Sequence, residues 1–136
     1  MRFTVPGVPF GKQRPRTINK GGYAQTYTPN ETVIYENLVK MCYIAKSFPK
    51  FDDKDELRAE ITAYYSIPKS ASKKKRAAMI EGKIRPTKKP DADNIAKAIC
   101  DALNGVAYRD DSSIVELLVK KYYSEEPRVE VNLTKI

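Results

Sequence analysis

The sequence predicts one α/β (α+β) domain over residues 1–136, with helices packed on a mixed four-stranded sheet. Two features of the sequence predict this class. Stretches with the alternation of a strand and stretches with helical spacing follow one another in the order strand, helix, strand, helix, helix, strand, strand. The chain has 136 residues, of which 41% are hydrophobic. This is enough to bury one core but not two independent ones.

The first strand is followed by a loop and a long helix. Residues 1–10 alternate briefly and then meet prolines and a glycine, which is typical of a strand that ends in turns. Residues 11–28 are predicted to form a loop. Thr28, Pro29 and Glu31 make a capping box, which predicts a helix over residues 29–46. The apolar residues that recur at helical spacing in it are Val33, Ile34, Leu38, Cys42 and Ala45.

The middle of the chain predicts a strand and a short basic helix. Residues 57–67 alternate as in a half-buried strand. Residues 72–82 predict the helix, with Ser72 as a cap and Gly82 as its end. Residues 83–90 are predicted to be an exposed loop. The inward-facing residues of the strand are Leu57, Ala59, Ile61, Ala63, Tyr65 and Ile67.

The last third predicts one amphipathic helix and two strands. The helix begins near Asp93 and ends at Asn104 and Gly105. Residues 113–123 and 128–136 predict the strands, with a polar turn between them. The helix carries one apolar stripe with the spacing i, i+3, i+4, i+7, i+8, made of Ile95, Ala98, Ile99, Ala102 and Leu103.

The positive charge is concentrated in one segment. Residues 69–90 contain nine basic residues and one acidic residue, a net charge of 9 − 1 = +8, which equals that of the whole chain. Such a block favours a polyanionic partner such as nucleic acid, although a solvated face is the alternative. The residues of this block predicted to bind DNA are Lys73, Lys74, Lys75, Arg76, Lys88 and Lys89. Three basic residues of the N-terminal loop are also predicted to bind DNA: Lys12, Arg14 and Arg16.

Composition excludes several classes of protein. No apolar run is long enough to span a bilayer, and the first residues do not form a secretory signal, so we expect a cytoplasmic protein without a membrane partner. Cys42 and Cys100 lack metal-ligand spacing and are interpreted as small apolar residues. The chain has no histidine, which rules out Ser–His and Cys–His mechanisms. No small-molecule cofactor is expected.

Acidic residues gather directly after the basic block. Asp91 and Asp93 are two residues apart, so in extended chain their side chains point the same way. Asp93, Lys97 and Asp101 follow at i, i+4 and i+8, opposite the apolar stripe. Asp110 and Asp111 come after the helix and a short return. Spacing alone does not determine whether this pair meets the first one.

Carboxylates without histidine or cysteine form a hard-oxygen site. Such a site suits Mg²⁺ or Mn²⁺, which activates water and stabilises charge on a phosphodiester during in-line displacement. Lys97 would orient the water or stabilise the developing charge. The alternative is structural: Asp93 is an ordinary helix N-cap, and Asp110 with Ser112 is ordinary turn chemistry.

The segment KPDADNIAKAICDALNG, followed by YRDDSSI, resembles the RusA family of Holliday-junction resolvases, which is common in bacteria and prophages. The shared pattern is an aspartate pair split by one residue, an asparagine, a lysine four residues after the second aspartate, the triplet DAL and a downstream DD pair. The stretch VPGVPFGKQRPR near the start is also similar to the family's first strand and basic loop.

The resemblance implies a set of catalytic residues and a substrate. Asp91, Asp93 and Asp111 would be the essential, metal-holding acids and Lys97 the catalytic lysine, with Asp110 as an alternative to Asp111. It implies a homodimer that cuts four-way junction DNA symmetrically with Mg²⁺, for which Mn²⁺ may substitute, in recombination or DNA repair. Two other functions stay open: a non-catalytic nucleic-acid-binding module in which Asp91 and Asp93 only cap a helix, and a nuclease for forks, flaps or RNA.

Overall fold

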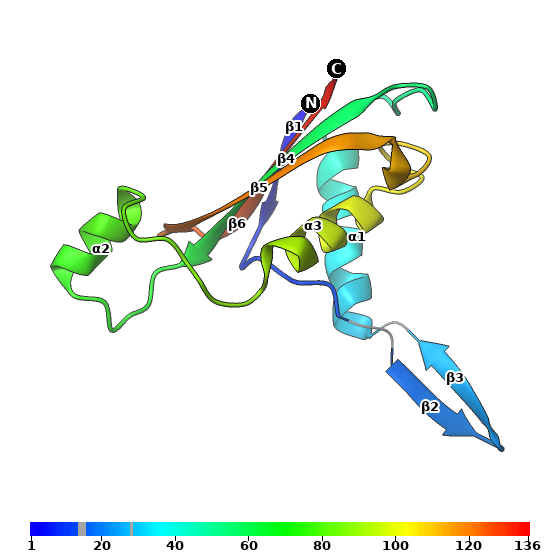
Figure 1. Cartoon of the computed structure of the whole chain (residues 1–136), viewed down its shortest axis with the longest axis horizontal. Helices are drawn as coiled ribbons and strands as arrows, with labels where there is room; N and C mark the ends of the chain where they lie inside the picture. Colours follow the sequence, from blue (N-terminus) through cyan, green and yellow to red (C-terminus); the bar gives the residue numbers. More distant parts are fainter. Residues whose placement is uncertain (14–15, 28) are drawn as a thin grey trace.

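A computed structural model describes residues 1–13, 16–27 and 29–136 of the chain (Figure 1). Its main sheet has the strand order β1-β6-β4-β5. The strands are β1 (Arg2–Pro6), β4 (Leu57–Ser66), β5 (Ile114–Ser124) and β6 (Arg128–Lys135). β6 is antiparallel to both β1 and β4, whereas β4 and β5 are parallel. The predicted mixed four-stranded sheet is therefore confirmed.

The parallel pair β4 and β5 requires a long crossover, because neighbouring parallel strands run in the same direction. Residues 67–113 supply this connection. They contain α2 (Lys73–Ile80), α3 (Ala92–Ala102) and the short 3₁₀-helix η1 (Asp111–Ser113). The basic block and the carboxylate-rich segment thus lie on the same crossover.

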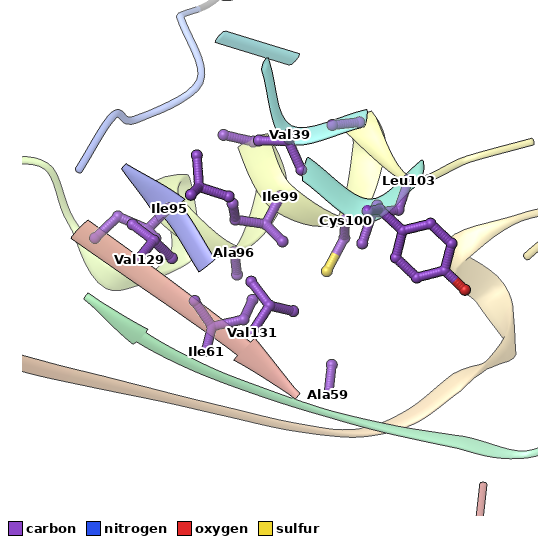
Figure 2. Packing of buried hydrophobic residues seen from close by; sticks show 14 of the residues in the cluster. Val39, Ala59, Ile61, Ile95, Ala96, Ile99, Cys100, Leu103, Val129 and Val131 are labelled. Carbon is purple, nitrogen blue, oxygen red and sulfur yellow. The ribbon is translucent and has the colours of Figure 1, made fainter. Parts of the chain in front are cut away.

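The core lies between one face of the sheet and the helices α1 (Asn30–Ile44) and α3 (Figure 1). The predicted stripe of α3, from Ile95 to Leu103, is completely buried. Figure 2 shows Ile95 and Ile99 close to Val129, Val131 and Ile61 of the sheet. The inward residues predicted for β4 are also buried. Both amphipathic predictions are confirmed.

The apolar stripe predicted for α1 is confirmed only in part: Leu38 and Cys42 are half-buried against the core, but the rest of the stripe is exposed. Val33 and Ile34 are exposed, and the helix instead buries Thr32, Tyr35, Val39 and Tyr43. The reason is aromatic packing, because a buried tyrosine ring removes more apolar surface from water than the aliphatic side chains that it displaces. The Tyr43 ring meets Phe3 edge-on at 5.5 Å, and the Tyr35 ring stacks on Phe10 at 5.1 Å. Thr28 of the predicted capping box lies outside the described residues.

The predicted loop over residues 11–28 is wrong for residues 16–27, which form a hairpin. β2 (Arg16–Lys20) pairs antiparallel with β3 (Tyr23–Tyr27). Gly21 and Gly22 both have positive φ, which the tight two-residue turn requires and which glycine adopts without strain. The hairpin projects away from the rest of the molecule (Figure 1). No helix among the described residues is long and apolar enough to span a membrane.

Candidate active site

A pocket of about 330 Å³ lies between α3 and the start of β5. Its charged residues are Asp93 and Lys97, one helical turn apart on α3, and Asp111 from η1. Its apolar wall consists of Ala96, Cys100, Ile114 and Leu117. The structure therefore brings three of the four predicted catalytic residues to one cavity.

The return loop after α3 brings Asp111 back to the helix. The buried Tyr108 donates a hydrogen bond of 2.7 Å from its hydroxyl to the Cys100 carbonyl, which holds the loop against the last turn of α3. The Asn104 side-chain carbonyl accepts the Asp111 amide at 2.8 Å. The loop thus doubles back, and Asp111 reaches the pocket although it is separated from Asp93 by nearly the whole helix.

Asp110 and Asp111 have different environments. The Asp110 carboxylate accepts the Ser112 amide at 3.0 Å as the cap of η1. Hydrogen bonding by the Ser112 side chain, together with that of the Ser112 amide, lowers the pKa of Asp110. Asp111 is half-buried in the pocket. Burial, together with the negative charges of Asp110 and Asp101, raises the pKa of the Asp111 carboxyl. Asp110 thus has the turn role that its sequence context allowed, and Asp111 alone of the pair faces Asp93 and Lys97.

Asp91 lies at the N-cap of α3, exposed and outside the lining of the pocket. Its side chain makes no capping hydrogen bond, and Asp93 lies inside the first turn rather than at the cap. Neither Asp91 nor Asp93 therefore caps the helix with its side chain, so capping does not account for either residue. The catalytic roles of Asp91, Asp93, Lys97 and Asp111 stay predictions.

The N-terminus of α3 is held by the N-terminal loop and by β4. The Lys12 amide donates to the Asn94 carbonyl at 3.2 Å, and the Tyr65 hydroxyl donates to the Pro90 carbonyl. Gly11 lies so close that a Cβ placed on it would be 2.8 Å from the Pro90 Cβ and 3.3 Å from that of Asn94. These contacts fix the stretch of chain that carries Asp91 and Asp93.

The Lys12 side chain faces acidic partners in this structure. Its ammonium lies 2.7 Å from Asp101 and 3.4 Å from Glu36. Partial burial works against the charged form of Lys12, but the hydrogen bonds and charges of Asp101 and Glu36 outweigh it and raise the pKa of Lys12. Asp101 therefore joins the N-terminal loop to α3. DNA binding by Lys12 stays a prediction, and contact with a phosphate would compete with this ion pair.

The other predicted DNA-binding residues lie on separate parts of the surface. Lys73, Lys74 and Lys75 are exposed on α2, where Ser72 caps the helix as predicted. Arg76 pairs with Glu125 at 3.5 Å. Lys88 and Lys89 are exposed in the loop before α3. Arg14 and the side chain of Arg16 lie outside the described residues. In Figure 1, α2 and the β2–β3 hairpin lie at opposite ends of the molecule, with α3 between them.

Sequence reasoning missed the apolar wall of the pocket. Ala96 and Cys100 stand at i+3 and i+7 from Asp93, so helical spacing alone would have placed them beside it. Burial raises the pKa of the Cys100 thiol to about 12. The thiol therefore stays protonated and contributes as a small apolar group. Ile114 and Leu117 carried no such local signal, because only the tertiary fold brings β5 to this helix.

The donor chemistry of the pocket fits a hard divalent cation. Mg²⁺ is commonly held by one or two carboxylates, with water and substrate phosphate completing its octahedron. Asp93 and Asp111 offer two carboxylates on one cavity, with no histidine or thiolate that would favour zinc. Within the described ranges, no three acidic, histidine or cysteine side chains are close enough to enclose a metal ion. The two carboxylates therefore suit a metal site in which water and substrate supply the remaining ligands.

Comparison with known proteins identifies the family. The family model for endodeoxyribonuclease RusA matches residues 6–134. An uncharacterized protein of Bacillus subtilis (strain 168), YqaN, is 37% identical over 138 residues, covering 100% of this chain and 96% of that protein. The crossover junction endodeoxyribonuclease rusA of Lactococcus phage r1t is 28% identical over 137 residues, covering 98% and 95%. The chain therefore belongs to the RusA family of endodeoxyribonucleases.

Proposed function

We propose that this protein is a Mg²⁺-dependent endonuclease that resolves four-way DNA junctions, acting as a homodimer in recombination or DNA repair. One observation carries the proposal: Asp93, Lys97 and Asp111 line the same pocket at the surface. The printed name of the phage relative, crossover junction endodeoxyribonuclease, supports the choice of substrate. Mn²⁺ has the same ligand preferences and would substitute for Mg²⁺.

The residues of the pocket divide the chemistry between them. Asp93 and Asp111 would hold the cation, and the exposed Asp91, two residues before Asp93 in the sequence, would be a third acid. When bound, Mg²⁺ supplies an activated water and offsets charge on the phosphodiester. The Lys97 ammonium, on the same face of α3 as Asp93, stabilises the negative charge that develops on the phosphate oxygens.

Exposed lysines on α2 and in the loop before α3 support the binding of a large polyanion beside this pocket. The lysines of α2 are exposed, as are Lys88 and Lys89 directly before α3. β2, whose sequence includes Arg16 and Lys20, lies at the opposite end of the molecule from α2 (Figure 1). A substrate with several duplex arms could contact these separated surfaces together, whereas a single short duplex would reach fewer of them.

A labelled four-way junction tests the proposal directly. With Mg²⁺, the protein should nick two strands of like polarity at symmetric positions, and a chelator should abolish the nicks. A linear duplex of the same sequence is the control and should stay uncut. Competition with fork, flap and hairpin RNA substrates ranks the alternatives. Junction binding without scission at any metal concentration would establish the non-catalytic module instead.

Replacing residues 73–76 together by alanine is expected to flatten the salt dependence of junction binding. Each lost phosphate contact should lower the log–log slope by about 0.9, so the slope should fall by roughly 2–4 in total. A fluorescence anisotropy titration at several salt concentrations measures it. The matched control replaces three exposed lysines elsewhere, Lys46, Lys50 and Lys54, and should leave the slope within about 1. Equal slopes for the wild type and the α2 variant would make this segment a solvated surface only.

A further inference from the structure

Lys12 lies along α3 and contacts both ends of the helix. Its amide donates to the Asn94 carbonyl in the first turn at 3.2 Å. Its ammonium donates to the Asp101 carboxylate in the last turn at 2.7 Å. The two side chains of this ion pair are only 21% and 22% exposed. The pair is therefore better shielded from solvent than an ordinary surface ion pair, which contributes little to stability.

A second carboxylate approaches the same ammonium. Glu36 of α1 lies 3.4 Å from it, and its side chain is 17% exposed. Without the charge of Lys12, Asp101 and Glu36 would place two negative charges near each other at a partly buried position. Leaving a charge there without a partner costs more free energy than the ion pair itself contributes. Asp101 would therefore attract another cation.

The other cation within reach of Asp101 along the helix is Lys97. It is the only basic residue of α3, and it precedes Asp101 by four residues, so the two side chains are neighbours on the helix surface. Asp93 precedes Lys97 by the same spacing. None of the ion pairs among the described residues involves Lys97, which is exposed at the pocket. Lys97 thus stands between two carboxylates, and Lys12 already neutralises one of them.

We propose that Lys12 is a positioning residue, which neutralises Asp101 and so leaves the Lys97 ammonium available to the pocket. The inference rests on the proposed function, in which Lys97 stabilises charge on the phosphate. It deepens that function by adding a residue that is not among the described residues lining the pocket. The effect of Lys12 on the reaction is therefore indirect and acts through Lys97.

Lys12 is also a predicted DNA-binding residue, and the two roles have different consequences. A phosphate contact acts on junction affinity, and its loss cannot be repaired by a change at Asp101. A positioning role acts on the cleavage step, and removal of the Asp101 charge makes Lys12 dispensable. A double-mutant cycle of Lys12 and Asp101 therefore separates the two roles.

Lys12→Met is expected to lower the single-turnover rate of junction cleavage by on the order of tenfold, with junction affinity within about threefold of wild type. Methionine keeps an apolar stem and removes the charge. Asp101→Asn and the double variant should both cut within about threefold of the wild-type rate, because both lack the carboxylate that competes for Lys97. Lys12→Arg keeps the ion pair and should also cut normally. Lys46→Met removes the same charge at an exposed position and controls for net charge.

Thermal unfolding tests the same inference without DNA. Lys97→Met should lower the melting temperature by roughly 2 °C more in the Lys12→Met background than in the wild type, because Lys97 then pairs with Asp101. In the Lys12→Met/Asp101→Asn background this difference should disappear. The unfolding curves also verify that each variant is folded.

Three outcomes would overturn the inference. If Lys12→Met loses junction affinity and Asp101→Asn does not restore it, Lys12 is a phosphate contact. If Lys12→Met cuts at the wild-type rate, Asp101 does not compete for Lys97. If Lys97→Met has the same effect on unfolding in both backgrounds, Lys97 does not turn to Asp101. A wild type that folds but cuts no junction disproves the proposed function instead, and the unfolding cycle still decides this inference.

Discussion

Asp93→Asn is expected to lower the rate of junction cleavage by on the order of 10³-fold while leaving junction affinity within about threefold. The amide has nearly the shape of the carboxylate but no negative charge, so it cannot hold a divalent cation as the carboxylate does. Asp93 lines the pocket with Lys97 and Asp111, and its side chain is exposed on the first turn of α3. Single-turnover cleavage and anisotropy binding separate the two quantities.

Asp110→Asn is the matched control for this prediction. Its carboxylate caps η1 through the Ser112 amide, and an asparagine oxygen can accept the same hydrogen bond. Cleavage should therefore stay within about threefold of wild type. If Asp93→Asn loses binding together with cleavage, Asp93 is a structural residue. If Asp110→Asn is the inactive variant, Asp110 rather than Asp111 is the downstream aspartate that holds the metal.

Gly11→Ala is expected to reduce cleavage by about 10²-fold, although Gly11 is outside the pocket. The added Cβ would lie 2.8 Å from the Pro90 Cβ, so one of the two segments must move. Pro90 directly precedes Asp91, and Asn94 directly follows Asp93. The displacement is therefore passed to the first turn of α3. A shift of a fraction of an ångström there changes the position of Asp93 relative to Asp111.

The effect of Gly11→Ala should appear in the catalytic rate more than in junction binding, because the charges of the surface are unchanged. Val8→Ala is the control, since Val8 belongs to the same N-terminal segment and is exposed. It should retain wild-type cleavage. A normal rate in Gly11→Ala would show that the loop yields without moving the helix. Thermal unfolding of both variants distinguishes a displaced helix from a loss of folded protein.

The parts of the fold that local periodicity specifies could be predicted. The apolar stripe of α3 and the alternation of β4 each bury one side of a single element. Both patterns can therefore be recognised within a short stretch of sequence. In α1, two stripes competed. The aliphatic residues fitted helical spacing, but Tyr35 and Tyr43 fitted it equally well and buried larger rings. The β2–β3 hairpin had a local signal in its Gly-Gly turn, which the polar sequence around it concealed.

The candidate site was predictable on the helix but not around it. Asp93 and Lys97 are one turn apart wherever that helix lies, so spacing was sufficient. Asp111 depends on the return loop, where Tyr108 and Asn104 make the contacts that turn the chain back. The pairing of Lys12 with Asp101 joins residues 89 positions apart, and no local pattern carries such information. Contacts between residues so far apart in the sequence can be identified only from the three-dimensional structure.

The crossover between β4 and β5 has one part that should tolerate inserted residues and another part that fixes the positions of the candidate catalytic residues. Its middle, directly before α3, is fixed, because the Tyr65 hydroxyl and the Lys121 ammonium donate to the Pro90 and Lys88 carbonyls. Its near end, at residues 68–72, leads into the basic helix without such anchors to α3. Closing a longer flexible loop costs only about 0.6 kcal/mol for each doubling of its length. Inserted residues at this point would change how far the positive charge extends from the protein while the distances among the carboxylates are kept. If α2 binds the substrate as proposed, substrate binding and bond cleavage can therefore change independently through mutations in this one connection.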